Sequence, residues 1–252
     1  RATTSITVRK ALESIGAVLF WLLVWQIAAA LANRTLLLPL PTPADTAAAL
    51  WRMASQPDFW RILAASALRI CGGFAAALVL GVLCAAASAR WRLFRCLTAP
   101  LVQLIRAIPV AVFTIVVFLW VSRPYIPSVI VFFTVLPVVW SNVETGLCHT
   151  DRRLCEMAQV FGMARRQLLR QITLPAIRPY LTTAVTSGLG FAWKSGIAAE
   201  VICRTRGSLG DLLWSSKAAV SYDEVFALTV VIVVCSSLLQ RAAAPRRKEE
   251  TP

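Results

Sequence analysis

The chain is divided into long apolar blocks, and this division restricts its possible folds more than any other feature. Residues 13–32, for example, carry only one charged side chain, that of Glu13. A helix needs about 20 mainly apolar residues to cross the hydrocarbon core of a bilayer. Hydrophobic residues make up 58% of the chain, whereas soluble domains contain about 45–50%. The blocks therefore predict an all-α, polytopic membrane protein.

Six such blocks can be delimited, and the charges between them predict an orientation. The blocks cover about residues 13–32, 62–89, 97–122, 127–147, 179–202 and 224–240. The net charge of +14 comes from short basic clusters between blocks, without the interleaved aromatics of a nucleic-acid surface. One alternate set of connections holds about twice as many Lys and Arg as the other, which the positive-inside rule places in the cytoplasm. Both termini, residues 1–12 and 241–252, are then cytoplasmic.

Prolines interrupt two blocks and one connection. Residues 33–60 begin with three closely spaced prolines, which favour an extended chain. A short amphipathic helix over 43–54 follows, with Asp45 and Thr46 placed to cap its start. We expect 33–60 to lie on the outer membrane surface. Prolines inside blocks 97–122 and 127–147 predict kinked helices, which can line a cavity or serve the structure alone.

The sequence does not indicate that the chain binds ATP, holds a metal ion or catalyses a reaction by itself. The sequence contains no G-x-x-x-x-G-K-[ST] loop for ATP phosphates. It has one histidine, His149, and seven scattered cysteines without a C-x-x-C pair, so neither a zinc site nor acid–base catalysis is favoured. We expect no enzyme, no metal and no cofactor in the chain itself.

A motif with fixed spacing lies in the long cytoplasmic connection, residues 148–178. A short helix is predicted over 151–161 from Asp151, with a sharp turn at Gly162. A second, basic helix is predicted from about 164, ending at Pro175 before the next span. This connection matches an E-A-A-x3-G-x9-I-x-L-P pattern at six positions: Glu156, Ala158, Gly162, Ile172, Leu174 and Pro175. The alternative is an ordinary amphipathic loop.

This spacing resembles the EAA motif of permease subunits of ATP-binding cassette (ABC) importers, with Met157 in place of one alanine. A second resemblance runs from about residue 39 to 240. It is carried by Arg106-Ala107-Ile108-Pro109, by Leu136-Pro137 and by the segment GLGFAWK with AAE that ends at Glu200. Together these are similar to the nitrate/sulfonate/taurine-type and bicarbonate-type permeases, the binding-protein-dependent inner membrane components.

The resemblance implies a type I ABC importer permease-like fold, with one transmembrane permease domain over 13–240. It implies that the 148–178 connection docks on a separate ATPase and transmits its motion to the spans. ATP and Mg²⁺ would be bound by that partner. It also implies a homodimer of permeases, two ATPase subunits, and an extracytoplasmic binding protein that delivers a small, anionic solute.

Ionisable side chains within predicted spans are candidates for a translocation pathway, because such groups usually face a cavity or a partner. Arg106, beside Pro109, can line an inner pathway or extend to the inner headgroups. Lys194 can face the pathway or form a structural ion pair. Glu200, with Gly207 and Gly210 in the outer segment 203–223, can contribute to an outer gate or belong to a plain re-entrant turn.

A stand-alone channel or ion-driven carrier is the alternative function. Such a protein needs acidic or polar groups at mid-membrane for its ion. Only Glu144 and Glu200 come into question, and both lie near predicted span ends. Transport by the purified chain alone, without ATP, would distinguish this function from that of an importer permease.

Overall fold

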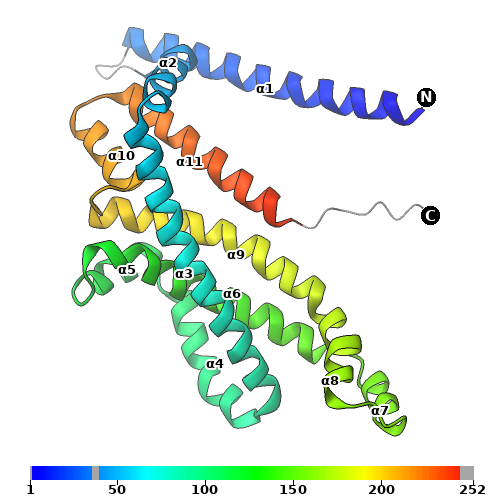
Figure 1. Ribbon diagram of the computed structural model, residues 1–252. Helices are drawn as coiled ribbons and strands as arrows, with labels where there is room; N and C mark the ends of the chain where they lie inside the picture. Colours follow the sequence, from blue (N-terminus) through cyan, green and yellow to red (C-terminus); the bar gives the residue numbers. More distant parts are fainter. Residues whose placement is uncertain (1, 36–39, 245–252) are drawn as a thin grey trace. The chain divides into compact units, whose positions relative to one another are not determined.

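The computed structural model describes residues 2–35 and 40–244, and every regular element in these ranges is helical, as expected (Figure 1). In chain order the elements are α1 (Ala2–Thr35), α2 (Pro43–Ala54), α3 (Pro57–Arg90), α4 (Arg92–Ala107), α5 (Val110–Phe118), η1 (Arg123–Tyr125), α6 (Ile126–Cys148), α7 (Arg152–Val160), α8 (Arg165–Leu168), η2 (Leu169–Thr173), α9 (Leu174–Cys203), α10 (Leu209–Ala218) and α11 (Tyr222–Ala243). Two compact units result. One combines Arg1–Trp60 with Leu213–Val231, and the other combines Arg61–Leu212 with the chain from Ile232.

The first unit contains α1, α2, the part of α10 from Leu213 on and the first part of α11. Helix α1 begins well before the predicted block, because residues 2–12 are helical too. Helix α2 has the predicted bounds, and Asp45 caps its start as predicted, because its carboxylate accepts hydrogen bonds from the Thr42 N–H and hydroxyl. The N-cap residue itself is Thr42, and Thr46 differs from the prediction because its hydroxyl donates to the Thr42 carbonyl. This reciprocal capping box fixes the start of α2.

The core of the second unit is the long pairing of α6 with α9, onto which α3 and α5 pack. Small residues allow these helices to approach closely. A Cβ on Gly73 of α3 would lie 2.3 Å from the carbonyl oxygen of Ser128 in α6. No other residue fits there, because real Cβ atoms do not approach so closely.

The third predicted block is broken, not merely kinked. The chain bends by 101° between α4 and α5. Pro109 has no N–H to continue the helix and disfavours helical dihedrals at the preceding residue, and Ile108 accordingly is extended with φ −76° and ψ 124°. By contrast Pro137 lies inside the continuous helix α6.

The helix expected to end at Pro175 continues through it, so that part of the prediction is wrong. A π-helical turn, η2, joins α8 directly to α9. Its wider ring, in which the Leu174 N–H bonds to the Leu169 carbonyl, changes the backbone pairing just before the proline. Pro175 then occupies the first turn of α9, where a missing N–H costs least.

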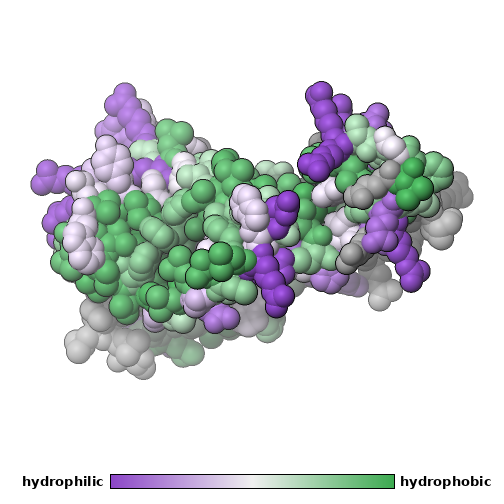
Figure 2. Space-filling view, turned by 90° about the horizontal axis from the view of Figure 1, so that it is seen from below, coloured by the Kyte–Doolittle hydropathy of each residue, from purple (hydrophilic) through white to green (hydrophobic). Residues whose placement is uncertain are grey.

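Four helices in the described residues are long and apolar enough to cross a membrane: 15–34 of α1, then α3, then 123–148 including α6, and α11. The α4–α5 pair would make a fifth if the bent pair is one span. Helix α9 covers the predicted block 179–202, but its Thr, Ser and Gly residues and its charges at Lys194 and Glu200 lower its apolar character. Figure 2 shows broad hydrophobic areas with hydrophilic side chains in a few separate clusters.

Candidate coupling and translocation sites

The 151–175 protrusion begins with α7, which follows α6 and starts where the sequence predicts. The Asp151 side chain accepts a hydrogen bond from the Arg153 N–H at 2.8 Å, and its carbonyl accepts one from the Cys155 N–H. An aspartate in this position satisfies N–H groups that have no partner within the helix. The prediction of a short helix that starts at Asp151 is confirmed, and the structure adds that Asp151 caps it.

Gly162 makes the sharp turn after α7. Its φ of +68° lies in the left-handed region, and the Met163 N–H reaches back to the Ala158 carbonyl at 2.9 Å. This pattern is the Schellman closure of a helix, which favours glycine because other residues carry a Cβ penalty. The predicted role of Gly162 as the turn residue is confirmed.

The second leg of the protrusion is α8, continued by η2 and α9. Gln167 Oε1 accepts a hydrogen bond from the Ala164 N–H at 3.1 Å and fixes the helix start. Arg165, Arg166 and Arg170 make this leg basic, as predicted. Helix α9, of 30 residues, follows α8 and η2 without a break.

The surface of the protrusion is apolar where the two legs meet. Val160 is 86% exposed and Phe161 is 80% exposed, and Met157 also projects. Large apolar side chains exposed together at a turn mark a contact surface more often than an ordinary solvated loop. Val160 and Phe161 immediately precede Gly162, so the turn presents them.

The motif positions divide between inside and outside. Ala158 is buried, and Ile172 is partly buried. Glu156, Leu174 and Pro175 are exposed, with Leu174 at 53%. The motif therefore combines packed positions with an outward surface.

Arg106 lies at a separate place, a cavity of about 500 Å³ between α4, α5, α6 and α9, whose lining includes Ile108 and Val110 on either side of Pro109 but not Pro109 itself. Its wall is largely apolar and includes Phe113 and Phe191. The polar part is formed by the Arg106 guanidinium, which donates to the Pro137 carbonyl at 2.7 Å and to the Ser141 hydroxyl. A mainly apolar concavity with a few convergent polar groups is the usual form of a ligand site.

Glu200 forms a buried corner with Ser66 and the chain from 203 to 210, here called the Glu200 corner. Its side chain is fully buried. The Ser66 hydroxyl donates to Oε2 at 2.8 Å, the Gly210 N–H donates to the same oxygen at 3.4 Å, and Arg69 approaches Oε1 at 3.5 Å. The Leu209 N–H donates to Ser66 Oγ at 2.9 Å. The carboxylate thus stands at the N-terminus of α10, where the helix dipole favours negative charge.

The two glycines of this corner have different roles. Gly207 has φ +65° and turns the chain, and its carbonyl faces Arg69 at 3.4 Å. At Gly210 a Cβ would lie 2.4 Å from the Val201 nitrogen, so the first turn of α10 rests directly on the last turn of α9. Arg69 holds this corner together through Glu200 and Gly207.

The predicted pathway residues are therefore not one cluster. Arg106 lines the cavity and Pro109 stands at the start of α5 beside it, while Glu200, Gly207 and Gly210 share the corner. Lys194 belongs to neither: its side chain is exposed on α9 and forms no ion pair within the described ranges.

Sequence reasoning missed the partners of these groups. Ser66 and Ser141 were not singled out, because a serine in an apolar block carries no pattern of its own. An ion pair between Arg95 and Glu144, 2.8 Å apart, ties α4 to α6 and was also missed. A buried charge in a span does signal that such partners exist, but not which residues they are.

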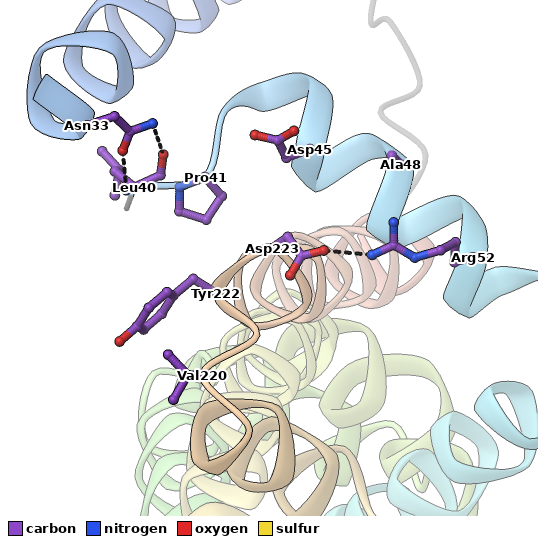
Figure 3. Close-up of a pocket in the computed structure, with 9 residues that line it drawn as sticks. All are labelled: Asn33, Leu40, Pro41, Asp45, Ala48, Arg52, Val220, Tyr222 and Asp223. Atoms are coloured by element: carbon purple, nitrogen blue, oxygen red, sulfur yellow. Dashed lines mark hydrogen bonds and ion pairs between the residues drawn. The ribbon is translucent and has the colours of Figure 1, made fainter. Parts of the chain in front are cut away.

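The first unit has a polar hollow of its own, about 300 Å³, shown in Figure 3. The Asn33 amide pairs with the Leu40 backbone through two hydrogen bonds of 3.2 and 2.7 Å. Arg52 and Asp223 form an ion pair at 2.6 Å across the hollow. These groups satisfy one another, and exposed pairs of this kind contribute about 0–1 kcal/mol.

Comparison with known proteins agrees with this geometry. The taurine transport system permease protein TauC of Escherichia coli K12 is 28% identical over 97% of this chain and 90% of its own length. The riboflavin transport system permease protein RibX of Chloroflexus aurantiacus is 27% identical over 87% of this chain and 84% of its own length. A solved structure of a bacterial alginate ABC transporter, in complex with a periplasmic protein holding an alginate pentasaccharide, has a chain of the same fold. Its TM-score is 0.58 at 13% identity, covering 95% of this chain and 94% of that one.

The family profile extends over most of the second unit and into the first. Residues 77–248 match the family described as the binding-protein-dependent transport system inner membrane component. This range includes the 151–175 protrusion, the Arg106 cavity and all of the Glu200 corner except Ser66 and Arg69. The chain belongs to the family of binding-protein-dependent transport system inner membrane components, the permease subunits of ABC transporters.

Proposed function

We propose that this chain is the permease subunit of an ABC importer and that it couples a separate ATPase to the passage of a small, anionic solute. The observation that carries the proposal is the 151–175 protrusion. It combines the motif spacing, a left-handed glycine turn and an exposed apolar tip at Val160 and Phe161 with a continuous helical connection into α9.

The mechanism follows from that connection. An ATPase surface that binds the apolar tip would remove it from water, which is favourable by about 25 cal/mol per Å² of apolar area. Movement of the bound tip then acts on α8, and through η2 on α9. Because α9 packs along α6 and carries Glu200 at its far end, the second unit can respond as one body.

The Arg106 cavity is the part of this chain that we assign to the solute. A guanidinium offers several N–H donors to carboxylate or sulfonate oxygens, and Arg106 already uses some of its donors on Pro137 and Ser141. The relatives named above are described as permeases for taurine and for riboflavin. These relatives support a small organic solute for this chain. We infer that the solute is an anion because the cavity presents the Arg106 guanidinium.

We infer further partners from the family. A second copy of the chain would complete the pathway, because one chain of this size surrounds only part of a channel. An extracytoplasmic binding protein would deliver the solute, and the ATPase would hold ATP and Mg²⁺. The protein resides in the inner membrane, with both termini on the cytoplasmic side in our proposal, as the excess of basic residues in the inner connections favours.

The test is purification of the tagged chain from its native membrane, with identification of proteins present in stoichiometric amount. We expect one ABC ATPase subunit for each copy of the chain. In the reconstituted complex, Gly162→Val should lower solute-stimulated ATPase activity at least about tenfold, because a β-branched residue opposes the left-handed turn. Gly162→Asn is the matched control and should keep most activity, since asparagine tolerates this conformation.

A chain that is purified alone and in which Gly162→Val and wild type behave identically would overturn the proposal. Transport by that lone chain in liposomes without ATP would establish the stand-alone carrier instead.

A further inference from the structure

A strongly basic hollow lies in the second unit, apart from the Arg106 cavity. It has a volume of about 310 Å³ and is formed where α5, η1, the end of α9 and the start of α10 come together. Three arginines line it, Arg123, Arg204 and Arg206, against a single carboxylate, Asp211. Most of the remaining lining is apolar, with Phe118 at one side.

The backbone brings the three arginines to one place. Thr205 is buried, and its hydroxyl donates to the Arg123 carbonyl at 3.3 Å, which joins the segment after α9 to η1. Arg204 and Arg206 flank this buried threonine and are exposed. The hydrogen bond therefore fixes Arg123 close to both.

Arg204 adopts an unusual conformation to reach this position. Its φ of 49° and ψ of 56° lie in the left-handed region, where residues other than glycine and asparagine are disfavoured. Such strain persists where the surrounding structure imposes it, and it is common at functional sites. A glycine would adopt this conformation at lower cost.

Arg123 lies over an aromatic ring that also lines the hollow. Its Cζ lies 5.4 Å from the centre of the Phe118 ring. A guanidinium stacked on a ring uses its face for that contact and keeps its N–H edge for oxygen acceptors. Arginines around one hollow can bind the oxygens of a sulfonate, carboxylate or phosphate with charge-assisted, two-point hydrogen bonds.

We propose that the hollow of Arg123, Arg204 and Arg206 is a binding site for an oxoanion group, distinct from the Arg106 cavity. Its ligand is the anionic group of a soluble solute or of a lipid headgroup. The predicted outer position of residues 203–223 makes it a place where an anionic solute is concentrated before entry. This inference rests on the proposed function only for that role in entry, because oxoanion binding itself needs no ATPase.

Binding can be measured on the full chain in maltoside micelles, with fluorophosphate as probe and fluorine NMR line broadening as readout, at constant ionic strength. We expect line broadening that saturates with wild type. In the double variant Arg204→Gln/Arg206→Gln, the affinity for fluorophosphate should be lower by a factor of at least about ten. The control Arg34→Gln/Arg61→Gln removes the same charge from the predicted outer side without touching the hollow, and it should bind like wild type.

The single variant Arg206→Gln serves if the double variant does not fold, and it should also weaken binding.

Native mass spectrometry distinguishes the two sources of the anionic group, a soluble solute and a lipid headgroup. Retained phosphatidylglycerol that fluorophosphate displaces identifies a lipid headgroup, whereas fluorophosphate binding without retained lipid identifies a soluble anion. Equal broadening in wild type and Arg206→Gln, with equal lipid retention, would overturn the site. The coupling experiment at Gly162 would be unaffected by that result.

Discussion

The 151–175 protrusion and the Glu200 corner both connect helices of the same unit, yet they are stabilised in opposite ways. The protrusion is held by bonds between near neighbours, such as Met163 to Ala158, and leaves Phe161 80% exposed. The corner is held by bonds between distant residues, such as Ser66 to Glu200, and leaves the carboxylate fully buried. In our proposal the ATPase covers the first, whereas the buried contacts of the second keep one shape.

The largest effect that this comparison predicts is at Gly210. In Gly210→Ala the new Cβ would lie 2.4 Å from the Val201 nitrogen, so α10 must move off α9. Overpacking a core lowers the free energy of unfolding by about 1–3 kcal/mol. Because the new Cβ would meet backbone atoms of α9, which cannot rotate away, we expect a loss of about 3 kcal/mol or more. The thermal midpoint in detergent is the measurement.

Gly72→Ala is the control for that variant. Gly72 lies in α3 with open space at its Cβ position, so alanine should leave stability unchanged or raise it by up to about 1 kcal/mol. If Gly210→Ala were as stable as Gly72→Ala, the rigid character of the corner would be refuted.

Ser66→Ala should produce the next largest effect. It removes the shortest hydrogen bond to Glu200 and leaves the Leu209 N–H without its acceptor. Loss of a buried partner costs about 1–3 kcal/mol. Ser237→Ala removes a hydroxyl that bonds only to the Val233 carbonyl of its own helix, and its midpoint should match that of wild type. Equal midpoints for the two variants would show that the corner does not depend on Ser66.

At the protrusion the expected effect is on binding and not on stability. Phe161→Ser exposes no new surface, because Phe161 is already 80% exposed. Its thermal midpoint should stay at the wild-type value, while retention of the ATPase during purification should fall about tenfold, as for a central apolar contact. Trp51→Ser, at a side chain 77% exposed in α2, should retain the ATPase fully. A fall in stability without a fall in ATPase retention would mean that Phe161 has an internal role.

The same contrast explains which features could be predicted from the sequence. The protrusion depends on local signals, an aspartate cap and a glycine at fixed spacing, and these predicted α7 and the turn at Gly162. Helix α10 was not predicted within the polar stretch 203–223. The start of α10 depends on Glu200 and on Ser66. The Ser66 hydroxyl accepts a hydrogen bond from the Leu209 N–H, although the two residues are 143 positions apart in the chain. No local pattern contains that information.

The prolines show the same limit in another way. Pro109, Pro137 and Pro175 carry the same local signal, yet the chain breaks at the first, continues as α6 at the second and passes a π-helical turn before the third. Arg106 bonds to the Pro137 carbonyl and holds α4 against α6, which helps fix the break at Ile108. The outcome at each proline is set by packing against neighbouring helices, which single-sequence reasoning does not contain.

The smallest predicted effect concerns Asp45, a local cap like Asp151 but in the first unit. Hydrogen bonds from the Thr42 hydroxyl and then the Thr42 N–H lower the pKa of Asp45 below its ordinary value of 3.8. The folded state therefore binds the proton less readily than the unfolded state. The stabilisation is complete above the ordinary pKa and is lost as the pH falls through the lower, folded-state pKa. Asp45→Asn should therefore have a slightly lower thermal midpoint than wild type at pH 7, and the difference should shrink below about pH 4. A difference that grows on acidification would show that the carboxylate does not act as a cap.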